Sequence, residues 1–68
     1  MATGVLKMFN PDKGFGFIKP DEGGDDVFVH VSTGERSGIQ LQQGMRLGFD
    51  VGQDRKTGKS RAENLRLL

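Results

Sequence analysis

Three phenylalanines and one histidine recur at every second position along two short segments of this chain. Phe15 and Phe17 lie in the first segment, and Phe28 and His30 lie in the second. A two-residue period is that of a β-strand, so each pair shares one face of its strand. Because lysines flank the first pair, such a surface suits unpaired nucleobases: rings stack on the base faces and ammonium groups meet the phosphates.

The opposite face of each segment is the better candidate for a hydrophobic core. It carries Ile18 with two glycines in the first segment, and Val27, Val29 and Val31 in the second. Burying a histidine and its lysine neighbours would be unfavourable, so we expect the aromatic face to meet water. The period alone leaves the reverse arrangement open, with the rings inside, since phenylalanine is often buried.

Five short strands separated by turns rich in glycine and proline account for most of the pattern. We expect these strands over residues 4–10, 14–19, 26–31, 45–53 and 60–67. Residues 32–44 show no sustained period and contain three glycines, which predicts a long connection with one short helical turn after Val31. The pattern therefore predicts an all-β fold, a small antiparallel barrel or sandwich.

The register of the first strand is only partly determined by the pattern. Either Leu6 with Met8, or Val5 with Phe9, could face inward. A β-bulge near Lys7 and Met8 would reconcile the two sets, because a bulge re-aims one side chain.

The last two predicted strands each have an apolar side. Leu47, Phe49 and Val51 alternate with polar or small residues, which predicts a half-buried strand with Phe49 inward. The final strand closes the chain with Leu65 and Leu67 on one side.

Composition limits the partners and the compartment. With 68 residues we expect a single domain over residues 1–68. A net charge of +1 argues against gripping duplex DNA mainly through charge. The chain has no cysteine, which fits a reducing, cytoplasmic setting. We expect neither a signal peptide nor a membrane span, since no long apolar stretch occurs.

The residues that could support catalysis or metal binding lack partners. His30 could act as a general base, but no cysteine or second histidine accompanies it. The acidic run at residues 21–26 lacks the spacing and final glutamate of an EF-hand, so we expect a solvated loop. An enzyme such as a small nuclease would need paired carboxylates with a suitable base. We therefore expect no catalytic residue, no metal site and no cofactor.

The order of these motifs resembles the bacterial cold-shock domain family. K-M-F-N at residues 7–10 resembles the family's K-W-F-N, and K-G-F-G-F-I at residues 13–18 is its first RNA-binding motif unbroken. V-F-V-H-V-S at residues 27–32 resembles V-F-V-H-F-S. The resemblance covers nearly the whole chain and implies a five-stranded antiparallel barrel of the OB type that binds single-stranded RNA and DNA.

The resemblance also implies which residues meet nucleic acid. Bases would stack on Phe15, Phe17, Phe28 and His30. Contacts to the backbone, to base edges and to polar groups would come from Lys7, Lys13, Asn10 and Asp25. We add Lys59 and Arg61 as candidates near the last strand, although solvation is the usual role of such side chains.

At three positions the chain departs from the family pattern. Met8, Val31 and Ile39 stand where the family usually has tryptophan, phenylalanine and another aromatic residue. Stacking contributes about 1–3 kcal/mol per ring, so we expect weaker binding over a footprint shortened at both ends. Met8 and Ile39 keep part of the apolar contact, and all three positions remain candidate contacts.

The function implied by the resemblance is that of an RNA chaperone. Such a protein stacks unpaired, pyrimidine-rich RNA or DNA, opposes RNA secondary structure and thereby influences transcription or translation. The alternative is a barrel with weakened nucleic-acid binding that serves as a protein-interaction module. Exposure of the three phenylalanines among lysines would favour the first. We expect a monomer and leave open a dimer formed by strand exchange.

Overall fold

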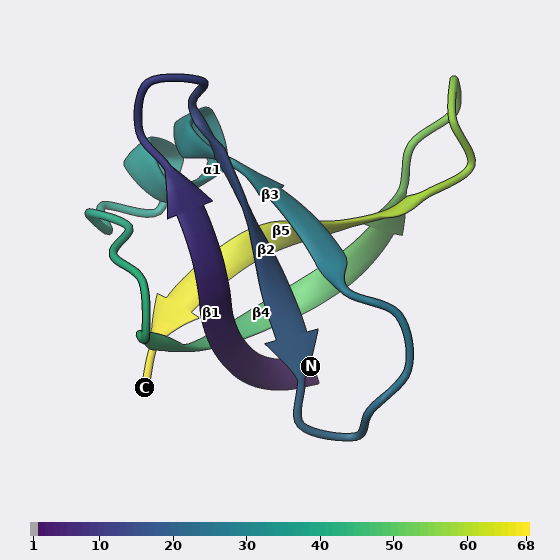
Figure 1. The fold of residues 1–68 in the computed structure, drawn as a ribbon, viewed down its shortest axis with the longest axis horizontal. Coiled ribbons are helices and arrows are strands. Elements are labelled where there is room, and N and C mark those ends of the chain that lie inside the picture. Colours follow the sequence, from purple (N-terminus) through teal and green to yellow (C-terminus); the bar gives the residue numbers. More distant parts are fainter. Residues whose placement is uncertain (1) are drawn as a thin grey trace.

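Five strands close into a barrel in the computed structural model, which describes residues 2–68. They are β1 (Ala2–Asn10), β2 (Phe15–Pro20), β3 (Val27–His30), β4 (Arg46–Gln53) and β5 (Ser60–Leu67). Their order around the barrel is β1-β2-β3-β5-β4 (Figure 1). Neighbouring strands run antiparallel except β3 and β5, which pair in parallel through Phe28 and Arg61. The predicted all-β barrel of the OB type is confirmed.

The core is aliphatic apart from one ring. The buried side chains are Leu6, Ile18, Val27, Val29, Leu41, Leu47, Phe49, Ala62 and Leu65. The aliphatic faces of β2 and β3 therefore point inward, as the alternation predicts, and the rings of Phe15, Phe17 and Phe28 lie outside. Val31 departs from this pattern: it is only half-buried because the strand ends at His30 and Val31 begins a helix.

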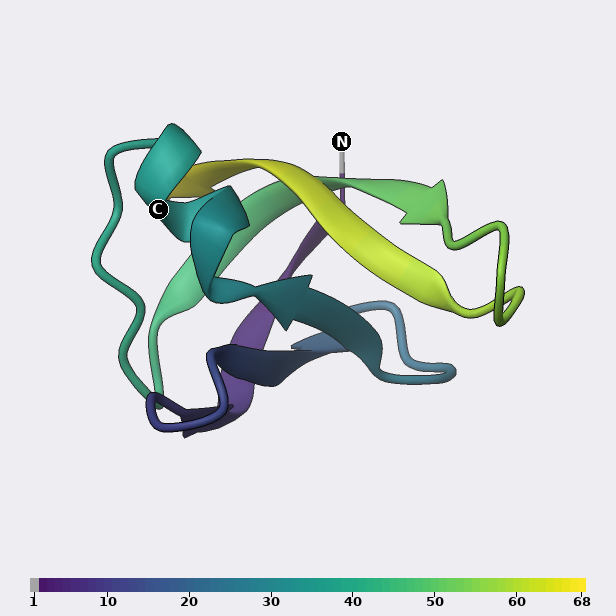
Figure 2. The same cartoon turned by 90° about the horizontal axis from the view of Figure 1, so that it is seen from above.

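That helix, α1 (Val31–Arg36), is the predicted short helical turn. It packs against β3 and β5, and Gly34 is buried where it meets Leu41. A Cβ at Gly34 would lie 2.9 Å from Leu41 Cγ, a separation that real Cβ atoms essentially never show, so the close approach requires glycine there. The connection after α1 then runs along one side of the barrel to β4 (Figures 1 and 2).

The predicted bulge in β1 is confirmed. Leu6 pairs with Ile18, whereas Met8 pairs with Phe17, so the register shifts between Leu6 and Met8. The shift turns Leu6 fully inward and lets Phe9 pack against the core while partly buried. The inward side chains of β1 therefore include Leu6 from one predicted set and Phe9 from the other.

The apolar sides of β4 and β5 are less buried at their ends than the alternation suggests. Val51 is 55% exposed and lies two residues before β4 ends at Gln53. From there the chain enters the projecting loop between β4 and β5 (Figure 1). Leu67 is 65% exposed near the end of the chain, although Leu65 is buried. Within β5, Asn64 adopts a φ of 51°, and this left-handed residue places the inward side chains Ala62 and Leu65 three positions apart.

The strand ends opposite α1 are tied together by a small polar cluster. The Thr3 hydroxyl donates to Asp21 Oδ2 at 2.7 Å, and Arg46 Nη2 donates to the same oxygen at 2.8 Å. These contacts hold the pKa of the Asp21 carboxyl below its usual value, the Thr3 bond most of all and Arg46 in addition, against an opposing effect of burial. The cluster joins β1, the β2–β3 loop and β4.

Candidate nucleic-acid interface

Phe15, Phe17 and Phe28 form a cluster of touching rings on the outside of the barrel, here called the aromatic triad. The register of β2 and β3 pairs Phe17 with Phe28 and Phe15 with His30. Phe15 and Phe28 are stacked, with centroids 5.7 Å apart and planes 28° apart. Phe17 meets both rings edge to face at 5.9 Å. All three are half-buried, so the rings support one another and still present apolar surface to solvent.

His30 extends this surface and is fixed by the start of α1. Its Nδ1 accepts a hydrogen bond from the Ser32 backbone N–H at 3.1 Å, and the Ser32 hydroxyl lies 2.9 Å from the same nitrogen. A nitrogen that accepts from an N–H carries no proton, so the proton of the neutral ring sits on Nε2. The imidazole is exposed and opposes Phe15 in the sheet register.

A hollow of about 330 Å³ adjoins the aromatic triad, here called the triad hollow. One wall is made by the three rings. The other is polar and is lined by Asp54, Thr57, Lys59, Ser60 and Arg61. The volume is at the small end of the range for ligand pockets. The structure thus places Lys59 and Arg61 in the same hollow as the three rings.

The β4–β5 loop, residues 54–59, supplies much of that polar wall and projects from the barrel (Figures 1 and 2). The Gly58 N–H donates to the Asp54 carbonyl at 2.8 Å, and the Asp54 N–H donates to the Lys59 carbonyl at 2.8 Å. Gln53 Nε2 donates to the Gly58 carbonyl at 3.1 Å. The loop is therefore a turn closed by its own hydrogen bonds, and Lys59 at its end lines the triad hollow.

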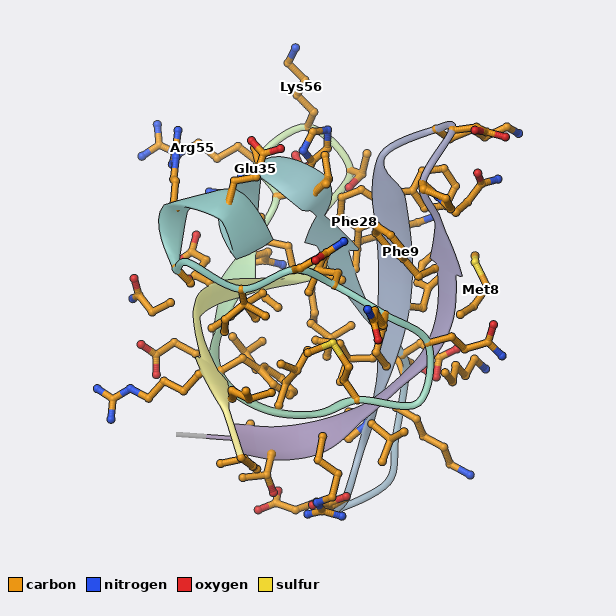
Figure 3. The ribbon with its side chains drawn as sticks, turned by 90° about the vertical axis from the view of Figure 1, so that its left-hand side faces the viewer. Met8, Phe9, Phe28, Glu35, Arg55 and Lys56 are labelled. Carbon is orange, nitrogen blue, oxygen red and sulfur yellow. The ribbon has the colours of Figure 1, made fainter. Side chains whose placement is uncertain are left out.

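The β1 side of the triad carries Met8 and Lys7. Met8 pairs with Phe17 across β1 and β2, and its side chain points away from the barrel interior (Figure 3). Lys7 Nζ lies 2.6 Å from Asp26 Oδ2, and both side chains are partly exposed. A phosphate that binds Lys7 must therefore compete with Asp26, a partner that sequence reasoning missed.

Asn10 and Lys13 shape the turn between β1 and β2. Asn10 Oδ1 accepts hydrogen bonds from the backbone N–H groups of Asp12 at 3.1 Å and Lys13 at 3.2 Å. These bonds fold the turn that starts β2 at Phe15, so Asn10 positions the triad through the backbone. Lys13 is exposed next to the triad strand, and Asp25 is exposed in the β2–β3 loop.

Val31 and Ile39 do not adjoin the triad hollow but line a separate hollow of about 710 Å³ beside α1, here called the α1 hollow. Phe9, Pro11 and Leu41 complete its apolar lining, with Glu35 and three glutamines at residues 40, 42 and 43. Figure 3 views the molecule from this side, with Phe9 and Glu35 labelled. Two of the three positions where the chain lacks an expected ring therefore share one hollow.

A polar groove of about 520 Å³ is lined by residues of α1 and β5 and shares Phe28, Asp54 and Arg61 with the triad hollow. Arg36 and Glu63 also line it, and neither was predicted from the sequence. Arg61 Nε donates a hydrogen bond to Glu63 Oε1 at 3.0 Å, and Arg61 Nη2 forms an ion pair with the same oxygen at 3.0 Å. Two-residue spacing on a strand with opposite charges is the signal that could have revealed this pair.

The site offers stacking surfaces and hydrogen-bond donors. Among residues 2–68, no three histidine, cysteine, aspartate or glutamate side chains lie together in a way that would hold a metal ion. No helix in this part of the chain is long and apolar enough to cross a membrane.

Comparison with known proteins gives a consistent result. The sequence model of the 'Cold-shock' DNA-binding domain matches residues 2–68. The chain is 53% identical over 66 residues to the probable cold shock protein y4cH of Sinorhizobium fredii, covering 96% of each chain. It is 52% identical over 67 residues to the cold shock protein CspA of Rhizobium meliloti, covering 97% of each. With the cold shock protein ScoF of Streptomyces coelicolor it shares 47% identity over 66 residues, 96% of each.

Proposed function

Because the chain belongs to the cold-shock domain family, a family of nucleic-acid-binding proteins, we propose that it binds single-stranded RNA and DNA on the aromatic triad and His30. By holding bases in the unpaired state it opposes RNA secondary structure. It thereby acts as an RNA chaperone that influences transcription or translation.

The observation that carries this proposal is the position of the three rings. They touch one another on the outer surface while the core beneath them is closed by aliphatic side chains. Exposed rings contribute less to folding than buried ones, so their clustering points to a ligand. A base in a duplex is already stacked on its neighbours, whereas an unpaired base has a free face for a ring.

Basic side chains around the rings supply the contacts to phosphate. We propose this role for Lys7, Lys13, Lys59 and Arg61, each of which is exposed. If each neutralises one phosphate, log K falls with log salt at a slope no steeper than about −2.8, since single strands give about −0.7 per phosphate. Such modest salt dependence fits a protein of net charge +1 that gains most of its affinity from stacking.

An amide NMR titration tests the proposal with a short oligothymidine and a matched duplex at two salt concentrations. The chain has no tryptophan or tyrosine, so intrinsic fluorescence reports little. We expect the single strand to shift the signals of residues 13–18 and 28–31. If these signals do not move, or if the duplex binds more tightly, the proposal is wrong and a protein-interaction role becomes the better explanation.

The chaperone activity needs its own measurement. A hairpin RNA carrying a fluorophore and a quencher at its ends should open when the protein is added, and a variant with Phe17→Ala and Phe28→Ala should not open it. The RNA should remain intact during incubation with a divalent metal, because the proposed activity breaks no covalent bond. We further propose that the protein binds as a monomer in the cytoplasm and prefers pyrimidine-rich strands, as its family resemblance implies.

A further inference from the structure

Arg61 is held in a defined orientation at the edge of the aromatic triad. Its Nε donates a hydrogen bond to Glu63 Oε1 at 3.0 Å, and its Nη2 forms an ion pair with the same oxygen at 3.0 Å. Its backbone pairs with Phe28 where β3 meets β5, and its side chain lines the triad hollow together with the three rings. Arg61 therefore borders the triad hollow.

Glu63 can hold Arg61 because the neighbouring strand leaves room for its carboxylate. Gly52 of β4 pairs with Arg61, and a Cβ at Gly52 would lie 2.7 Å from Glu63 Oε1. The glutamate side chain thus lies across the bare backbone of Gly52. Residues two apart on a strand share a face, so Glu63 reaches Arg61 along the outer surface of β5.

The geometry leaves donors free on the side of the ligand. A guanidinium group carries five N–H donors and no acceptor, and of these the Nε hydrogen is donated to Glu63. Lys59, another donor, lines the same hollow. A base edge with two adjacent acceptors fits these groups best, and guanine presents such a pair at O6 and N7. Adenine places an amino group beside N7, where it would oppose a second donor.

We propose that Glu63 positions Arg61 to read the edge of one base stacked in the triad hollow, with a preference for guanine. This inference rests on the proposed function, because it requires a base on the triad. Glu63 itself touches no nucleic acid and acts through Arg61. Positioning and charge predict opposite results when Glu63 is removed. A carboxylate near phosphates repels them, so a purely electrostatic role predicts tighter binding without Glu63.

The test uses hexathymidine and a series in which one thymine at a time is replaced by guanine, adenine or cytosine. Fluorescence anisotropy with end-labelled oligonucleotides gives the affinities. For the unmodified protein, guanine at one position should tighten binding roughly tenfold, or about 1.4 kcal/mol. Glu63→Ala should reduce that gain below about twofold without weakening hexathymidine. Glu63→Gln, whose carbonyl oxygen can still accept from Arg61, should keep most of the gain.

Two further variants show whether the effect of Glu63→Ala comes from the position of Arg61, from the lost charge or from poor folding. Asp50→Ala removes an equal charge from the residue that pairs with Glu63 across β4 and β5, and it should retain the full guanine gain. Arg61→Lys keeps the charge but loses the planar fork, so it should lose the guanine gain even if Glu63→Ala folds poorly.

The outcomes distinguish this inference from the function on which it rests. Tighter binding of every oligonucleotide by Glu63→Ala, with the guanine gain intact, would show that Glu63 acts only as a charge and would overturn the inference. Equal affinity for all four bases at every position, or an equal gain with cytosine, would overturn the guanine preference. Hexathymidine would still bind the triad in each of these cases. Loss of hexathymidine binding to the unmodified protein would instead contradict the proposed function itself.

Discussion

The aromatic triad and the α1 hollow lie on neighbouring parts of the barrel but are built differently. The triad consists of three rings in mutual contact, backed by aliphatic core residues. The α1 hollow has Phe9 as the ring in its lining, and Val31 and Ile39 stand where the family usually has aromatic residues. The same fold thus presents a filled stacking surface on one side and an open apolar hollow on the other.

We infer from this difference that bases stack mainly on the aromatic triad and not in the α1 hollow. Each ring of the triad is held by the other two, so it is ordered before a base arrives and little side-chain freedom is lost on binding. A base in the α1 hollow would meet smaller, aliphatic side chains. We therefore expect short oligomers to bind nearly as well per site as long ones.

Removal of a triad ring should produce the largest effect. Phe17→Ala or Phe28→Ala should weaken binding to a short oligothymidine by about 1–3 kcal/mol, or roughly 5- to 150-fold. Fluorescence anisotropy measures the loss, and amide spectra check that the barrel remains folded. Phe9→Ala in the α1 hollow is the comparison variant. If it weakens binding as much as Phe17→Ala, the two regions do not differ as described.

Restoration of rings in the α1 hollow should have the next largest effect, in the opposite direction. Val31→Phe combined with Ile39→Phe should tighten binding of long oligomers by about 1–2 kcal/mol, less than two full stacking contributions because valine and isoleucine already give apolar contact. Oligomers too short to reach beyond the triad should gain little. An equal gain for short and long oligomers would place the benefit outside the α1 hollow.

Breaking the ion pair between Lys7 and Asp26 should have a smaller effect on binding beside the aromatic triad. Exposed ion pairs contribute about 0–1 kcal/mol, so Asp26→Asn should tighten single-strand binding by about two- to threefold and make the salt dependence steeper. Glu22→Gln, which removes a charge from the same loop without breaking the Lys7 pair, is the matched control. A similar gain in both variants would assign the effect to net charge.

The smallest effect on binding is expected from the Asp21 cluster, which lies away from both regions. The folded-state pKa of the Asp21 carboxyl is below its ordinary value. The ionised carboxyl therefore stabilises the fold at pH values above that ordinary pKa. This contribution is lost as the pH falls through the folded-state pKa. Urea unfolding between pH 2 and 7 should show a shallower acid dependence for Asp21→Asn, with unchanged oligothymidine binding at pH 7. The same acid dependence in both proteins would contradict this account.

Much of the fold follows from local patterns in the sequence. Predicted strand bounds differ from the observed ones by no more than two residues. The two-residue period of β2 and β3 identified the core face, because an aliphatic face and an aromatic face with lysines differ clearly in their cost of burial. The β1 bulge was predictable because two incompatible inward sets overlapped near Lys7 and Met8.

The remaining features depend on contacts between distant segments. Val31 was expected to face the core, but the strand ends one residue earlier, where His30 caps α1. Its proximity to Ile39 in the α1 hollow follows from the path of the connection after α1. The left-handed residue Asn64 and the glutamate across Gly52 depend on how β4 and β5 pair, which no alternation within a single strand encodes.

The parallel contact between β3 and β5 forms a seam in the barrel beside the aromatic triad. In the described part of the chain this contact consists of the pair Phe28 and Arg61, whereas β4 and β5 pair along most of their length. Segments with few backbone hydrogen bonds open locally at low free energy. A strand of nucleic acid that contacts both residues would bridge β3 and β5 from outside, so the bound ligand would stabilise the closed barrel.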